Sequence, residues 1–127
     1  MMNFLDNYKD QAYALLRIMS GLMFIQHGAQ KLLNFPAEFP YPLSNLTMAA
    51  GTIELVGGAL IVLGLFTRQT AFIASGFSAA AYWMSHGMNA VYPILNGGEL
   101  VALYCFVFLF IAASGAGIWS LDAKRAK

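Results

Sequence analysis

The chain has 127 residues, of which 59% are hydrophobic and only 10% are charged. Soluble domains carry roughly 25% charged residues, so this composition indicates a membrane protein rather than a soluble globule. The net charge of +1, with no run of like charges, excludes an electrostatic nucleic-acid-binding surface. The length suits a single domain, which we expect to cover residues 1–127.

Four apolar segments follow one another, each close to the roughly 20 residues that a helix needs to cross a bilayer. They predict helices at about residues 12–33, 46–66, 70–92 and 98–119. The segments are apolar nearly all round, whereas the helices of a soluble bundle have a polar face. The sequence therefore predicts an all-α fold, a bundle of four transmembrane helices surrounded by lipid.

The N-terminal segment lacks the pattern of a cleaved signal peptide, because Asp6, Asp10 and Arg17 interrupt its apolar run. We therefore expect the first helix to remain in the mature protein. Cys105 is the single cysteine and lies in the apolar stretch LYCFVFLF. It excludes an intramolecular disulfide and predicts a buried, unreactive side chain.

The segments between the expected helices carry residues that end helices. NFPAEFPYPLSN contains three prolines and predicts the longest loop, with Ser44, Asn45 and Thr47 as candidate N-caps of the second helix. FTRQT predicts a tight turn before the third helix. In YPILNGG, Pro93 and the pair Gly97-Gly98 separate the third helix from the fourth.

The basic residues predict an orientation in the membrane. They gather on the side that holds both termini and the FTRQT turn, and are Lys9, Arg68, Lys124, Arg125 and Lys127. The positive-inside rule then places both termini in the cytoplasm. We interpret Arg17 as an anchor whose side chain snorkels to this surface, and Arg68 as a marker at the tight turn.

Polar residues concentrate in the outer half of the predicted bundle, where His27 and Lys31 lie one helical turn apart. The other members of this cluster, on the second, third and fourth helices, are Glu54, Tyr82, His86, Asn89 and Glu99. Ionisable groups facing lipid cost several kcal/mol, so the cluster should face the interior. We predict that Glu54 hydrogen-bonds at least one of Lys31, His27 and His86.

Two interpretations of the cluster stay open, a structural salt bridge between helices and a ligand or redox site. Beside Glu54, close approach of another helix is favoured by a strip of residues, Gly51, Leu55 and Gly58. A second stripe of small and polar residues on the third helix comprises Ser75, Ala79, Tyr82, His86 and Asn89. Tyr82 and Trp83 also suit an aromatic belt at the membrane surface, and Glu99 suits a first helical turn.

These motifs together resemble those of the DoxX family of small four-helix membrane proteins. The resemblance covers almost the whole chain, through LLRIMSGLMFIQHGAQKL, AGTIELVGGALIVLGLFTRQTA, His86 and NGGELVALYCFVFLFIAASGAGIWSLDA. It implies a membrane subunit associated with respiratory or other redox systems, in a bacterial inner membrane. The recurring polar positions of the family, without settled catalytic roles, correspond to His27, Lys31, Glu54, Arg68, His86 and Glu99.

Three kinds of function remain, and the sequence leaves open whether the protein is an enzyme. The first is an oxidoreductase subunit that binds a quinone, where histidine and carboxylate handle protons and Tyr82 and Trp83 contact the ring. The second is a haem or metal site using His27 and His86. Because two histidines are the bare minimum for such a site, we expect no tightly bound haem or metal.

The third is a non-catalytic interaction or assembly subunit, or a small-solute carrier, in which the cluster is a structural latch. The expected partners are the lipid bilayer, subunits of a redox complex or a second copy of the chain.

Overall fold

Helices account for every regular element of the computed structural model, which describes residues 3–127. Within those residues the predicted all-α class is confirmed. The chain forms two units, of which one contains the chain up to Thr67 together with Ala116–Lys127 and the other is Arg68–Gly115.

The first unit is built on two long helices. A 3-10 turn, η1 (Asn3–Tyr8), leads into α1 (Lys9–Leu33), which begins slightly before the predicted start. The second helix, α2 (Asn45–Leu63), starts as predicted, because Ser44 and Thr47 cap it reciprocally. The Ser44 hydroxyl accepts from the Thr47 N–H at 3.2 Å, and the Thr47 hydroxyl accepts from the Ser44 N–H at 2.8 Å.

Helix α2 ends at Leu63, before the predicted end at residue 66. Gly64 adopts a left-handed conformation with φ of 65°, which stops the helix and returns its N–H to the carbonyl of Ile61. The turn therefore lies at Gly64–Phe66, and FTRQT is not a turn as a whole, because Thr67 already begins the next helix.

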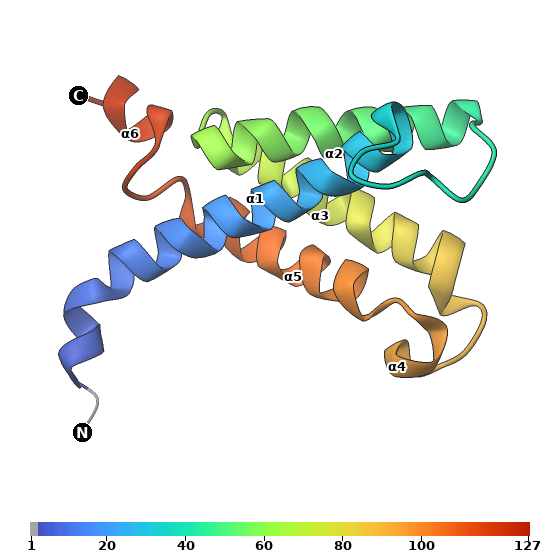
Figure 1. The fold of residues 1–127 in the computed structure, drawn as a ribbon. Coiled ribbons are helices and arrows are strands. Elements are labelled where there is room, and N and C mark those ends of the chain that lie inside the picture. Colours follow the sequence, from blue (N-terminus) through green and yellow to red (C-terminus); the bar gives the residue numbers. More distant parts are fainter. Residues whose placement is uncertain (1–2) are drawn as a thin grey trace. The chain divides into compact units, whose positions relative to one another are not determined.

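Helices α1 and α2 pack antiparallel through glycines on both helices (Figure 1). A Cβ added to Gly28 would lie 2.6 Å from the carbonyl oxygen of Gly51, and one added to Gly21 would lie 2.9 Å from that of Gly58. No side chain fits at such a distance, so the two backbones touch directly, as small residues permit in membranes. The predicted close-approach strip on the second helix is thereby confirmed.

The second unit contains α3 (Thr67–Tyr82), a π-helical turn η2 (Trp83–Gly87), a short α4 (Pro93–Asn96) and α5 (Glu99–Ser114). The Ser75 hydroxyl of α3 donates to the Cys105 carbonyl of α5 at 2.7 Å. The Cys105 side chain is half-buried rather than buried.

Both predicted helices of this region were too long. Regular α-helix ends at Tyr82 instead of residue 92, because the chain changes to π-helical hydrogen bonding at Trp83. The predicted stripe from Ser75 to Asn89 assumed the 100° rotation per residue of an α-helix. This rotation does not hold beyond Tyr82, so the stripe does not extend to His86. The last long helix ends at Ser114 instead of 119, where Gly115 has φ of 88°, and a separate short helix, α6 (Leu121–Arg125), follows.

Within residues 3–127, α2 is the one helix that is both long and apolar enough to cross a bilayer by these two criteria. Helix α5 is apolar but shorter. Helix α1 has 25 residues, and its polar members include Arg17 and Lys31. A bundle of four transmembrane helices therefore stays a prediction.

Candidate functional site

Lys31 of α1 and Glu54 of α2 form an ion pair in the first unit. The ammonium nitrogen lies 2.9 Å from Oε1 and 2.7 Å from Oε2 of the carboxylate. The side chains are only 17% and 8% exposed. The prediction that Glu54 faces inward and bonds at least one of three named partners is thereby confirmed, with Lys31 as the partner.

The glycine packing of the two helices explains why this pair can form. Gly28 and Gly51 bring the backbones into contact one turn from each charged residue, so the long Lys31 side chain reaches the Glu54 carboxylate. The Lys31 ammonium also lies 5.8 Å from the centre of the Phe39 ring, in the loop after α1. His27, one turn before Lys31, is half-buried.

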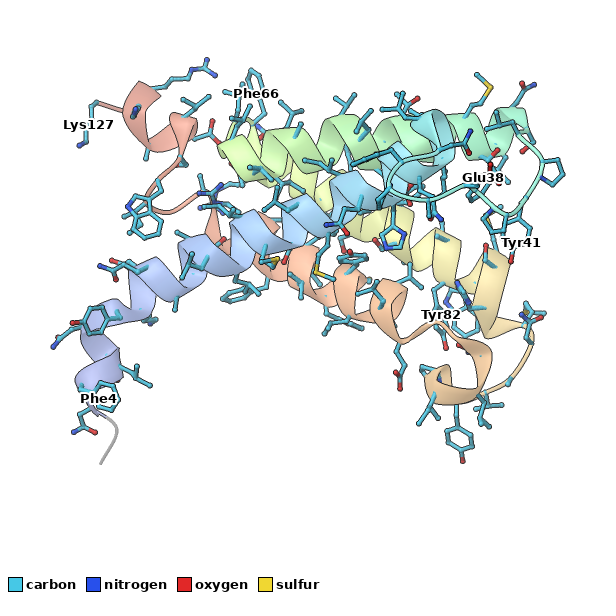
Figure 2. All side chains as sticks on the ribbon, viewed as in Figure 1. Phe4, Glu38, Tyr41, Phe66, Tyr82 and Lys127 are labelled. Atoms are coloured by element: carbon cyan, nitrogen blue, oxygen red, sulfur yellow. The ribbon has the colours of Figure 1, made fainter. Side chains whose placement is uncertain are left out.

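Asn96 organises a second polar network, in the second unit. Its side-chain amide donates to the Tyr82 hydroxyl at 2.9 Å and to the Ala90 carbonyl at 3.0 Å, and its Oδ1 accepts from the Gly98 N–H at 2.8 Å. Asn96 is buried, and all of its side-chain hydrogen-bonding groups are used. Tyr82, labelled in Figure 2, lies at the end of α3.

The same network fixes the tautomer of His86. Its Nδ1 lies 2.9 Å from the backbone carbonyl oxygen of Asn96. A carbonyl can only accept, so Nδ1 carries the hydrogen and the neutral ring keeps its lone pair on Nε2. Tyr82 and Trp83, which precede His86 in the chain, pack edge to face, with ring centroids 5.3 Å apart. Nε2 is therefore the ring nitrogen that can accept a hydrogen bond from a ligand.

Asn89 and Glu99, also predicted members of the cluster, lie outside this network. The Asn89 amide donates to the Ser85 carbonyl of its own turn at 3.2 Å, and its side chain is exposed. Glu99 lies in the first turn of α5, as predicted, and is exposed.

The predicted cluster thus divides between the two units. His27, Lys31 and Glu54 belong to the first, and Tyr82, His86, Asn89 and Glu99 to the second. Their common depth in a membrane stays a prediction. Among residues 3–127, no group of three or more His, Cys, Asp or Glu side chains is placed to hold a metal ion.

Arg17 has a different role from the predicted one. It is fully buried, so the interpretation as a snorkelling anchor was wrong. Its guanidinium donates to two carbonyls at the end of α2, Ile61 at 2.7 Å and Val62 at 2.8 Å. It also donates to Ile118 at 3.2 Å and Trp119 at 2.8 Å, in the segment before α6. The positive charge thus caps the negative end of α2 and fastens the C-terminal segment to it.

Asp122 completes this attachment from the C-terminal side. Its carboxylate accepts from the N–H of Phe66 at 3.0 Å, and from the N–H and hydroxyl of Thr67 at 2.9 and 2.8 Å. Desolvation opposes ionisation of Asp122, but the hydrogen bonds from Thr67 and Phe66 outweigh it and lower its pKa. We call Arg17 and Asp122, with the carbonyls and N–H groups they bind, the helix-end clasp.

Arg68 caps a helix end in the second unit. Its guanidinium donates to the carbonyls of Ala112, at 3.0 Å, and Ala113, at the end of α5. The residue lies in the first turn of α3 rather than in a tight turn. We predicted a marker at a tight turn, whereas the structure shows that Arg68 joins the start of α3 to the end of α5.

The roles of Asn96 and Asp122 were missed by the sequence analysis. Asn96 directly precedes Gly97-Gly98, a position where an Asn side chain commonly bonds the backbone two residues on. Asp122 follows Ser120, which caps α6 by accepting from the Ala123 N–H. These local patterns were visible in the sequence. The bonds of Asn96 to Tyr82 and of Asp122 to Thr67 were not, because they form between residues far apart in the chain.

Comparison with known proteins identifies the family. The DoxX family model matches residues 12–87, a stretch that holds Arg17, the Lys31–Glu54 pair, Arg68 and His86. This chain belongs to the DoxX family. An uncharacterised protein of Haemophilus influenzae is 45% identical over 97% of both chains. Membership of this family of membrane proteins supports a location in a membrane.

Two more distant relatives have names that describe them further. An uncharacterised membrane protein of Mycobacterium tuberculosis is 24% identical over 88% of this chain and 80% of its own. A Bacillus subtilis protein named "Putative oxidoreductase CatD" is 25% identical over 85% of this chain and 82% of its own. No solved structure is significantly similar to the chain.

Proposed function

We propose that this DoxX protein is an integral membrane subunit linked to redox or respiratory electron transfer, and that it binds a quinone-like ligand at His86. The carrying observation is the bond of His86 Nδ1 to the Asn96 carbonyl, which leaves Nε2 to accept a hydrogen bond from the ligand. The nearby residues Tyr82 and Trp83 supply aromatic rings for contact with it. The name of the Bacillus subtilis relative supports a redox role.

The chemistry follows from the two nitrogens of His86. A bound quinol donates the hydrogen of one hydroxyl to Nε2, and the Nδ1–H bond to the Asn96 carbonyl stabilises the resulting imidazolium. The proton of the second hydroxyl passes to water, and the two electrons pass to an oxidised electron-transfer centre in a partner redox subunit, so that the quinol leaves as the quinone. The protein therefore contributes ligand binding and proton transfer, and the partner contributes electron transfer.

The proposed topology has four membrane-spanning segments with both termini in the cytoplasm of a bacterial inner membrane. At 1.5 Å per residue, the 25 residues of α1 extend about 37 Å, more than the roughly 30 Å of a bilayer core. The 16-residue α5 extends about 24 Å, which a locally thinned bilayer accommodates. The distribution of Lys and Arg supports the orientation.

Quinone binding by the purified protein in lipid nanodiscs tests the proposal. A short-chain ubiquinone and a naphthoquinone are titrated, and binding is followed by separation of free from bound quinone. We expect saturable binding that is lost in His86→Ala and retained in Asn89→Ala, the matched control on the neighbouring turn. Absence of saturable binding, or equal binding by both variants, would contradict it.

One observation favours a second function, an assembly subunit without catalytic activity. Both oxygens of Glu54 bind the same ammonium group, which is the arrangement of a latch between α1 and α2. If the protein acts only in assembly, the intact latch is needed for partner association, and His86→Ala leaves that association unchanged.

A further inference from the structure

The segment between α3 and α5 exposes an unusual amount of apolar surface. Seven large side chains in it are between 61% and 85% exposed, and we call them the apolar cap: Trp83, Met84, Met88, Val91, Tyr92, Ile94 and Leu95. Exposed apolar side chains are ordinary when scattered, but a group of this density within thirteen residues indicates a contact surface.

Several polar groups of this segment bind one another. The side chain of Asn96 binds the Ala90 carbonyl and the Tyr82 hydroxyl, and its carbonyl holds the His86 ring. Backbone bonds from Asn89 to His86 and from Leu95 to Tyr92 close the two turns. The segment is thus folded around its own hydrogen bonds, while its large apolar side chains are left outside.

The residue types in and around the apolar cap indicate whether it contacts water, another protein or lipid. From Gln69 to Gly98 the sequence contains no Asp, Glu, Lys or Arg. Docking surfaces for proteins usually have a polar rim around the apolar centre. Trp and Tyr among aliphatic side chains are instead the composition of the membrane–water interface, where their amphipathic rings are favoured.

We propose that the apolar cap lies in the interfacial layer of the bilayer, at the boundary between lipid headgroups and acyl chains. It follows directly on α3 and leads into α5, whose Leu103 and Phe106 are 60% and 68% exposed. In a membrane protein such side chains meet lipid, so the cap continues that surface along the chain. The cap anchors the α3–α5 connection in the membrane and is not a water-exposed loop. This inference does not depend on quinone binding.

Tryptophan fluorescence tests the proposal directly. The chain has two tryptophans, so Trp119→Phe leaves Trp83 as the only one. This variant is reconstituted into phosphatidylcholine vesicles that contain lipids brominated near the headgroup or near the chain end, and aqueous iodide is added separately. We expect blue-shifted emission, strong quenching by the shallow bromines, and weak quenching by iodide.

Each other pattern overturns the proposal. Efficient iodide quenching would show a water-exposed loop. Protection from both bromine and iodide would show that protein covers Trp83, and its loss on dilution of protein in lipid would identify a second copy. Quenching mainly by the deep bromines would place the cap in the bilayer core.

A charge placed in the cap gives an independent measurement. Val91 is 85% exposed, so Val91→Lys leaves the packed interior unchanged. Lysine at this depth can extend its ammonium group to the headgroups and so serves as a second control; Val91→Asp, whose short side chain cannot, is the test variant. In the Trp119→Phe background we expect Val91→Asp to weaken the shallow quenching and to shift emission to longer wavelength compared with Val91→Leu. Identical spectra for Val91→Asp and Val91→Leu would contradict an interfacial cap.

Discussion

Lys31 in α1 holds both carboxylate oxygens of Glu54 in α2, at 2.9 and 2.7 Å. The contact joins two helices whose backbones already touch at Gly28 and Gly51. The glycines allow the two helices to approach each other closely. The ion pair favours this alignment of α1 against α2 over one shifted by a helical turn, in which the two charges would not meet. An apolar chain can keep a carboxylate here because its partner has the opposite charge and the same depth in the helix pair.

Removal of the Glu54 carboxylate should destabilise the protein. Glu54→Ala leaves the Lys31 ammonium buried without its partner, which typically costs about 3–5 kcal/mol. The free energy of unfolding, measured by denaturant titration in detergent micelles, should fall by that amount. Glu38→Ala, a change to an exposed carboxylate in the loop, is the matched control and should leave stability unchanged. Equal stability of the two variants would contradict a structural contribution of the pair.

Glu54→Gln separates a latch from a proton-handling group. Glutamine keeps the shape and one hydrogen-bond acceptor but loses the charge and the titratable proton. If the pair is only a latch, this variant recovers much of the stability lost in Glu54→Ala, and partner association is retained. If Glu54 takes part in proton transfer, the variant folds but loses quinone-dependent activity. The two readouts are unfolding free energy and turnover with a reduced quinone.

The helix-end clasp should govern the stability of the C-terminal segment. Hydrogen bonds to charged groups are worth about 1.5–3 kcal/mol each, so Arg17→Met should cost more than about 3 kcal/mol. Amide hydrogen exchange should become faster at Leu121–Arg125 and at the last turn of α2. Lys124→Met, which removes an exposed cation of the same short helix, is the control. Unchanged exchange in Arg17→Met would contradict the clasp.

How far the sequence predicts this fold depends on whether each signal is local. The start of α2 followed from Ser44 and Thr47, because a capping box lies within four residues. The end of α3 did not, since a change to π-helical bonding at Trp83 leaves no mark in the apolar pattern. The break at Gly115 had a visible glycine, but a single glycine within an apolar run does not by itself end a helix.

The candidate site shows the same division. The pairing of Glu54 with Lys31 was predictable, because few partners of opposite charge exist in so apolar a chain. The burial of Arg17 was not, since its partners are backbone carbonyls near Ile61 and Ile118, and these have no side-chain signature. For the same reason the bond between His86 and the Asn96 carbonyl could only come from the structure.

Asp122 should make the attachment of the C-terminal segment sensitive to acid. Its pKa in the folded protein is lowered from the ordinary value of 3.8, so the folded state favours the charged form. The stabilisation is therefore fully present above the unfolded pKa and is lost as the pH falls through the lowered folded value. Hydrogen exchange at the Phe66 and Thr67 amides should accelerate in that acidic range. In Asp122→Asn it should already be faster at neutral pH, and its dependence on acid should be weaker.

Site-directed labelling tests the proposed topology, with both termini in the cytoplasm. Cysteines are introduced at Leu43 and Ala126 in a Cys105→Ala background, since both positions are exposed. Ala126 caps α6 only through its backbone N–H, which a cysteine retains. In intact bacterial cells, a membrane-impermeant maleimide should label Leu43→Cys, in the proline-rich loop. It should label Ala126→Cys only after the inner membrane is permeabilised, because the basic residues at Lys124, Arg125 and Lys127 hold the terminus in the cytoplasm. Labelling of Ala126→Cys in intact cells would reverse the orientation, and with it the assignment of the Lys31–Glu54 pair to the outer half of the membrane.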